Sequence, residues 1–251
     1  MTLDDWLACP DLWVLPFELG VFPDRKLHLL TAALLRRVWD RLPSHHTRFA
    51  VEATEKFADG QISADALAWA RSQAVRDSEE RIWLAQGSHE DYNLIEGCGG
   101  WCPTCDSRAE RYECRVAKQG GILDGARAGI ETPAWVTASA AFYATELENP
   151  VFARDHSSDE FKWEWRNLFA TVREVLGEDG TRARLSPEWL TFDVRALAQG
   201  IHRDQAFDRL PILADALQDA GCDDETVLTH CRRPGGHVRG CWVVDLAMGI
   251  S

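Results

Sequence analysis

Four cysteines fall within one glycine-rich stretch, GCGGWCPTCDSRAERYEC, and we call them the insert cysteines. They are Cys98, Cys102, Cys105 and Cys114. Structural zinc sites hold the ion tetrahedrally with four protein side chains, and thiolate sulfur is a preferred ligand. Cys102 and Cys105 form a CxxC pair, which closes naturally on one ion. The spacing therefore predicts a structural zinc site here, although free thiols in an irregular loop would fit the same residues.

The insert cysteines also allow two redox interpretations. Cys98, Cys102 and Cys105 have the CxxxCxxC spacing by which radical-SAM enzymes hold an iron–sulfur cluster. Those enzymes resemble a β/α barrel, however, and this chain shows no alternation of strands and helices. A thioredoxin-like CxxC needs a βαβ setting that is absent as well. Both interpretations are therefore weaker than zinc.

A second group of potential metal ligands lies in HCRRPGGHVRGCWVVDL, near the end of the sequence. Its members are His230, Cys231, His237 and Cys241. His237 and Cys241 are spaced by one helical turn, which predicts that they share a helix face. His230 and Cys231 are adjacent and cannot easily face one ion together, while Cys222 would lie about 12 Å from His230 along a helix. We expect a second zinc site to use His237 and Cys241 with His230 or Cys231, and a fourth ligand from elsewhere. The alternative is a packed terminal helix with buried free thiols.

The same stretch predicts an anion-binding turn around Pro234, Gly235 and Gly236. Three arginines surround the turn, and they are Arg232, Arg233 and Arg239. Guanidinium groups and the backbone N–H groups of a turn that opens a helix can hold a phosphate or carboxylate. The alternative is that these arginines pair with nearby carboxylates of the chain itself. Those carboxylates include Asp215, Asp219 and Asp245.

The sequence contains no assembled catalytic motif. It has no phosphate-binding loop of the P-loop or Rossmann type, no HExxH and no strand-flanked nucleophile elbow. A metal-dependent enzyme would need three protein ligands, an open coordination position and a nearby carboxylate base. The C-terminal His/Cys group with Asp245 or Asp223 is the place where such an enzyme site is expected.

The elements that must position these residues are helical. In DRKLHLLTAALLRRVWDRL, leucine and valine recur at three- and four-residue spacing, which predicts a helix over 24–42 with Asp24 as its N-cap and Pro43 at its end. A second helix is predicted up to Gly60, and a third begins after Ser63.

Residues 87–129 interrupt this pattern with dense glycines and the insert cysteines, so we predict a Cys/Gly-rich inserted loop region. Helical spacing returns in 130–251, where DEFKWEWRNLFATVREVL has an apolar face. The last third predicts four short helices with turns near 203, 221 and 234; only CWVVDL leaves helix and strand open. The predicted fold is all-α, a multi-helix bundle-like globule whose parts at 1–86 and 130–251 share one continuous core.

Composition narrows the class of protein. The chain has 251 residues and a formal net charge of −13, which argues against direct binding to nucleic acid. No apolar run reaches the roughly 18 residues of a membrane span. The acidic start has no signal-peptide pattern, so we expect a cytoplasmic protein, in which eight cysteines favour thiols or metal ligands over disulfides. Of 11 tryptophans, most should fill gaps between helices, and a few could be exposed binding anchors.

Both ends of the chain carry a family resemblance. PDRKLHLLTAALLRRVWDRL followed by AVEATEKFADG, and the ending AFDRLPILADALQDAGC with HVRGCWVVDLAMG, resemble a large, mostly uncharacterised bacterial family. In that family an "SDRKLRLFACACCRRIW"-like helix precedes an "AVEVAERYADG"-like one, and "AFDRLPILADALEEAGC" leads to "GPHVRGCWVVDLLLG". The resemblance implies kinship and no activity. Ala32 and Ala33 stand where family members often carry paired cysteines, and the insert cysteines are outside the family pattern.

The leading hypothesis is a non-catalytic helical module that binds a protein partner and holds a structural zinc ion at the insert cysteines. The second hypothesis is a metal-dependent enzyme that uses the C-terminal His/Cys group. The third is an iron–sulfur redox protein.

Overall fold

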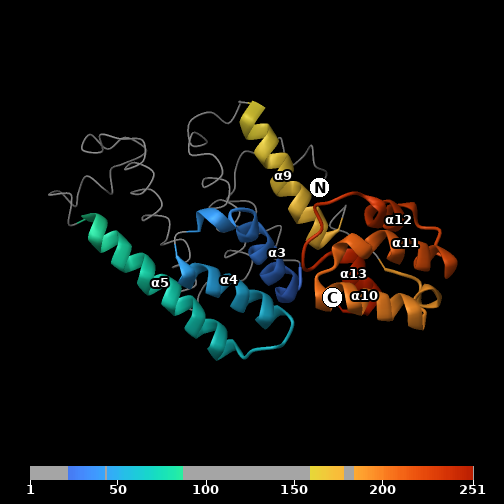
Figure 1. Ribbon diagram of the computed structural model, residues 1–251, viewed down its shortest axis with the longest axis horizontal. Helices are drawn as coiled ribbons and strands as arrows, with labels where there is room; N and C mark the ends of the chain where they lie inside the picture. The colour runs from blue at the N-terminus through green and yellow to red at the C-terminus, as the bar shows by residue number, and fades with distance from the viewer. Residues whose placement is uncertain (1–21, 43, 87–158, 178–183, 251) are drawn as a thin grey trace. The chain divides into compact units, whose positions relative to one another are not determined.

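The computed structural model describes residues 22–42, 44–86, 159–177 and 184–250 (Figure 1). Over these residues the chain forms eight α-helices and no strand, which confirms the all-α prediction. Two compact units divide the chain between Arg166 and Asn167. The predicted insert at 87–129, with its four cysteines, lies outside the described residues.

The N-terminal unit is built on three consecutive helices, α3 (Asp24–Arg37), α4 (His45–Ala58) and α5 (Ala64–Gln86), in which α4 packs against both neighbours. Serine caps begin two of them, as expected for a side-chain oxygen that accepts from an otherwise unpaired N–H. The Thr47 N–H donates to Ser44 Oγ, and the Ala66 N–H donates to Ser63 Oγ, each at 3.2 Å. The third helix thus begins after Ser63, as predicted.

The first helix ends earlier than its apolar spacing predicts. Helix α3 stops at Arg37, and a short 3₁₀ helix, η2 (Trp39–Arg41), follows it. Val38 and Leu42 remain buried despite the break, at 2% and 3% exposure. A 3₁₀ turn has about three residues, so it can keep apolar side chains on the core side after the α-helix has ended. The predicted N-cap is also shifted by one residue, because Pro23 occupies the cap and Asp24 the first turn.

The C-terminal unit contains the end of α9 (Asp159–Leu176) and the four short helices predicted for the last third. These are α10 (Phe192–Asp204), α11 (Leu210–Asp219), α12 (Glu225–Arg232) and α13 (Trp242–Met248). Two 3₁₀ helices precede α10 and α11, and they are η4 (Pro187–Trp189) and η5 (Phe207–Arg209). The ambiguous CWVVDL stretch is helical, since nearly all of it belongs to α13.

One apolar core holds the C-terminal unit together. Helix α10 packs on α11 and α13, and α11 packs on α12. The core side chains are almost fully excluded from water, with Ile201, Leu213 and Val243 at 0% exposure. Burying each such side chain contributes roughly 1.5–3 kcal/mol relative to leaving it exposed. The core therefore fixes the positions of α12 and α13, the two helices on either side of the 233–241 loop.

The 233–241 loop reverses the chain between α12 and α13. Gly235 and Gly236 have φ angles of +73° and +76°, in the left-handed region that glycine tolerates without a Cβ penalty. The turn predicted near 234 is thus confirmed. No helix in the described parts of the chain combines the length and the apolar character that a membrane span requires.

Candidate metal centre

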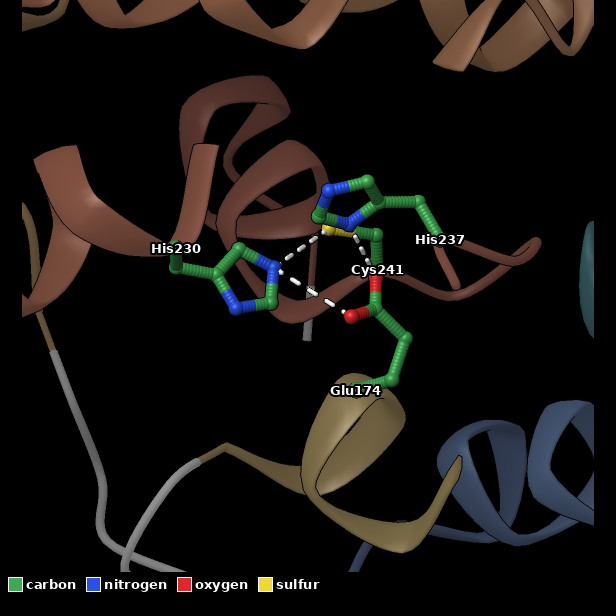
Figure 2. A group of neighbouring side chains, drawn as sticks. All are labelled: Glu174, His230, His237 and Cys241. Carbon is green, nitrogen blue, oxygen red and sulfur yellow. Dashed lines mark hydrogen bonds and ion pairs between the residues drawn. The ribbon is translucent and has the colours of Figure 1, made fainter. Parts of the chain in front are cut away.

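Four potential metal-ligand side chains converge inside the C-terminal unit, and we call them the buried ligand group. They are Glu174, His230, His237 and Cys241. One ligand atom from each lies within 4.8 Å of all the others. Figure 2 shows the four side chains pointing toward one another from separate parts of the unit. Such a group could hold a metal ion.

Each member is held by a different piece of backbone. Glu174 is in the last turn of α9, His230 is in α12, His237 is in the 233–241 loop, and Cys241 is the N-cap residue of α13. Helix α12 is itself fixed by Asp224, whose carboxylate accepts from the N–H groups of Thr226 and Val227 at 2.9 and 3.2 Å. The group therefore joins three helices and one loop.

Three contacts within the group are close in length to the edges of a coordination tetrahedron. His230 Nε2 lies 3.2 Å from Cys241 Sγ and 3.5 Å from Glu174 Oε2. His237 Nδ1 lies 3.0 Å from Glu174 Oε1. Zinc bonds of about 2.0–2.1 Å to nitrogen and oxygen and about 2.3 Å to sulfur would place neighbouring ligand atoms about 3.3–3.6 Å apart. The ligand atoms as a set lie within 4.8 Å of one another, so an ion would draw some of them closer together.

Three further contacts orient the group from outside. The Arg233 guanidinium donates to Glu174 Oε2 at 2.9 Å, and the backbone oxygen of Arg233 lies 3.0 Å from His237 Nε2. The indole N–H of Trp242 donates to His230 Nδ1 at 3.1 Å. These partners fix the rotation of each imidazole, and the carbonyl behind His237 is of the kind that metal-ligating histidines use.

The group is almost completely shielded from water. The side chains of Glu174, His230 and His237 are 0%, 1% and 4% exposed, and Cys241 is 0% exposed. Burial alone would raise the pKa of Glu174, but hydrogen bonds and charges from His230 and His237 outweigh it and lower the pKa to about 2. The carboxylate is therefore ionised at every physiological pH.

The pKa values of His237 and Cys241 are both raised, but for different reasons. Burial would lower the pKa of His237, but its hydrogen bond to Glu174 and the charge of that carboxylate raise it overall. Burial raises the pKa of the Cys241 thiol well above its usual value, and the Glu174 charge adds to this effect. Metal ligands must be deprotonated, so an ion binding here would displace protons from both residues.

The structure brings together three of the residues predicted for the C-terminal site, namely His230, His237 and Cys241. Cys231 is not part of the group; it is a separate buried thiol, whose pKa burial raises to about 12. The prediction that His237 and Cys241 share a helix face is wrong, because α13 begins only at Trp242. A loop after the Pro-Gly-Gly turn, rather than a helix face, places them together.

Glu174 is the member of the buried ligand group that the sequence patterns did not indicate. It lies 63 residues before His237, on a helix recognised only by its apolar face. The sequence carries 40 acidic residues, and nothing in the spacing of Glu174 distinguishes it from the others. Its signal is its complete burial, which becomes visible only once the C-terminal unit is folded.

The arginines of the predicted anion site contact carboxylates of the chain. Arg232 donates to Asp215 Oδ1 at 3.0 Å and to Gln218 Oε1 at 2.6 Å, while Arg233 donates to Glu174. Arg239 is half-buried. Pairing with the protein's own carboxylates, the alternative to anion binding, is therefore seen for Arg232 and Arg233. Anion binding at this turn stays a prediction.

The remaining predicted site residues lie elsewhere. The insert cysteines fall outside the described residues, so the zinc site predicted for them stays a prediction. Asp223 is exposed and Asp245 is buried, and neither belongs to the buried ligand group. Cys222 is a buried free thiol outside the group, in agreement with the expectation that it would not share an ion with His230.

The chain was compared with protein-family models, curated proteins and solved structures, and no match was found in any of the three. The bacterial family resemblance at the two ends of the chain therefore stays a prediction.

Proposed function

We propose that this chain is a zinc-binding helical protein and that the buried ligand group holds the ion. The observation that carries the proposal is the convergence of four ligand atoms within 4.8 Å, from three helices and a loop. Bringing a carboxylate, two imidazoles and a thiol together in a dry interior is costly unless they are paired or bind a metal. The zinc site is therefore proposed at the buried ligand group, which the structure describes, and not at the insert cysteines.

The donor set favours zinc among the common divalent ions. Thiolate sulfur, imidazole nitrogen and carboxylate oxygen make a borderline-soft set, which suits zinc and is too poor in oxygen for calcium or magnesium. Zinc also accepts a tetrahedral arrangement without a preference of its own. The negative charges of Glu174 and a Cys241 thiolate would balance the two positive charges of the ion.

The bound ion stabilises the C-terminal unit. It connects α9, through Glu174, to the 233–241 loop and the N-terminus of α13, so that unfolding of any one of them breaks a coordination bond. Metal affinity then adds to folding stability by mass action, by about 2.7 kcal/mol when free zinc is 100 times the dissociation constant.

The proposed protein partner has one supporting observation in the N-terminal unit. Trp69 is 59% exposed and Phe49 is 42% exposed, and their rings meet edge to face with centroids 5.9 Å apart. A paired, exposed aromatic surface is the kind of anchor that protein interfaces use.

Zinc content of purified protein tests the proposal, provided that the insert cysteines are removed as a second source of zinc. In a background with all four replaced by serine, we expect about one zinc per chain. Cys241→Ala should abolish this zinc. Cys231→Ala is the matched control, since Cys231 and Cys241 are both fully buried free thiols and only Cys241 belongs to the group. Equal zinc content in the two variants would contradict the proposal.

A further inference from the structure

The hydrogen bonds around His230 decide which of its ring nitrogens carries the proton. The indole N–H of Trp242 can only donate, and it points at His230 Nδ1 across 3.1 Å. Nδ1 must therefore accept with its lone pair. A neutral imidazole carries one proton, so the proton of His230 lies on Nε2.

That proton has acceptors already in place. His230 Nε2 lies 3.2 Å from Cys241 Sγ and 3.5 Å from Glu174 Oε2. Its N–H therefore faces the Glu174 carboxylate and the sulfur that would become a thiolate when a metal is bound. To bind an ion through Nε2, His230 would have to move its proton to Nδ1, where two N–H groups would then face each other across the contact with Trp242.

His237 has the opposite arrangement. Its Nε2 faces the backbone oxygen of Arg233 at 3.0 Å, an atom that can only accept. Its Nδ1 faces Glu174 Oε1 at 3.0 Å, so both ring nitrogens of His237 are placed to donate to acceptors. An ion can take the place of the Nδ1 proton while the Nε2–H keeps its carbonyl partner. A carbonyl behind the ring is the usual outer partner of a metal-bound histidine. An indole N–H behind the ring is not.

We propose that the zinc ion is bound by Glu174, His237 and Cys241. His230 does not bind the ion but donates a hydrogen bond from its Nε2–H group to the Cys241 thiolate. This inference rests on the proposed zinc site and goes further, because it leaves the fourth coordination position to a water molecule or a small monodentate anion beside His230. Trp242 is then a positioning residue that keeps His230 out of the coordination sphere. Three protein ligands with one exchangeable position is the arrangement of zinc sites that activate a bound ligand.

Cobalt(II) in place of zinc makes this arrangement visible, and azide is a suitable probe ligand. In the full chain with the insert cysteines replaced by serine, we expect cobalt to bind with a thiolate charge-transfer band, and azide to change the visible d–d bands. His230→Gln keeps an N–H donor, so its cobalt affinity should stay within about tenfold of the parent affinity. His237→Gln should lower the cobalt affinity by more than about 100-fold, which exceeds the effect of losing an outer partner of a ligand.

Trp242→Phe provides the second arm. Without the indole N–H, His230 can carry its proton on Nδ1 and bind the ion through Nε2, so the azide response should weaken or vanish while cobalt still binds. Circular dichroism of each variant controls for folding. One outcome would show that His230 is a ligand: the parent protein binds cobalt without a spectral response to azide, and His230→Gln and His237→Gln weaken cobalt binding equally. This inference would then be wrong, while the proposed zinc site would stand. If the parent binds no cobalt, both proposals fail together.

Discussion

At the scale of single residues, Glu174 is the centre of the site. Its two oxygens contact His237 and Arg233 at 3.0 and 2.9 Å, and His230 lies 3.5 Å away. A carboxylate so completely buried is stable only because cationic and N–H donors surround it. In the proposed zinc site the same carboxylate would also be a metal ligand, so metal binding and charge pairing would use one residue.

Replacing Glu174 with glutamine should remove both roles. We expect this variant to lose zinc. Even without metal, we expect the free energy of unfolding to decrease by about 3–5 kcal/mol, because the charges of Arg233 and His237 lose the Glu174 carboxylate that faces them. Zinc content and urea denaturation measure the two effects. Glu188→Gln is the control, since Glu188 is exposed and outside the group. A Glu174→Gln protein as stable as the control would show that the charge is not buried as described.

Zinc affinity should rise steeply with pH. The pKa of His237 is raised above 6.5 and the pKa of Cys241 well above 9, so each residue keeps its proton to a higher pH than the free side chain and releases it when the ion binds. The apparent affinity should increase up to about 100-fold per pH unit below the pKa of His237, and about tenfold per unit above it. Competition titrations against a chelator between pH 6 and 8 check this, and a flat profile would exclude ligation by these two residues.

Without metal, stability should change with pH in the opposite direction. A raised pKa of His237 contributes stability that is fully present below the unfolded value of 6.5 and is lost as the pH rises through the folded value. Glu174, with its pKa lowered to about 2, contributes stability above 4.5 that is lost only in strong acid. The denaturation midpoint of chelator-treated protein should therefore decrease from pH 6 to pH 8, and an increase would contradict the His237–Glu174 pairing.

At the scale of secondary structure, short helices place the ligands, and their ends matter more than their lengths. Helix α12 has eight residues, too few to be stable alone in water, so its cap and its packing hold His230 in place. Asp224 supplies the cap by accepting from two backbone N–H groups. The 233–241 loop and the first turn of α13 supply the next two members of the group.

Removing the cap should loosen the site without touching a ligand. We expect Asp224→Ala to lower the free energy of unfolding by about 0.5–2 kcal/mol and to weaken zinc binding, since α12 then frays at its beginning. Asp223→Ala is the matched control, because Asp223 is the exposed neighbour with the same charge. Thermal denaturation of both variants measures the difference, and equal midpoints would show that the Asp224 cap contributes nothing.

The helices themselves were predictable because their signals are local. The apolar spacing that contains Leu27, Leu30 and Leu34 predicts buried positions, and all three are at most 2% exposed. Ser63 and the Pro-Gly-Gly turn likewise mark boundaries through the backbone hydrogen bonds and φ angles that those residue types favour. The early end of α3 was missed, because a 3₁₀ turn preserves the apolar spacing.

The site was predictable only in part, because its assembly is not local. His230, His237 and Cys241 come from one short stretch, and their residue types alone suggested a shared ion. Glu174 reaches them only through the packing of α9 in the C-terminal unit, which no short-range pattern encodes. The roles of Trp242 and Arg233 depend on individual hydrogen-bond directions, and these too appear only in the folded structure.

At the scale of the whole molecule, the effect of the ion should be confined to one of the two units. All members of the buried ligand group come from the unit that begins at Asn167. On adding zinc to protein without insert cysteines, we expect slower amide hydrogen exchange in the end of α9, in α12 and in α13. Helices α3 and α4 should exchange at unchanged rates. Protection in α3 and α4 alone would place the bound ion outside the proposed site.

The central claim is that one zinc ion binds to a mixed oxygen, nitrogen and sulfur site in the C-terminal unit. X-ray absorption of the zinc-loaded chain, with all four insert cysteines replaced by serine, tests it most directly. We predict one sulfur at about 2.3 Å and the remaining ligands as nitrogen or oxygen at about 2.0–2.2 Å, with the sulfur lost in Cys241→Ala. A protein that retains no zinc, or a zinc shell without any sulfur, would contradict the claim.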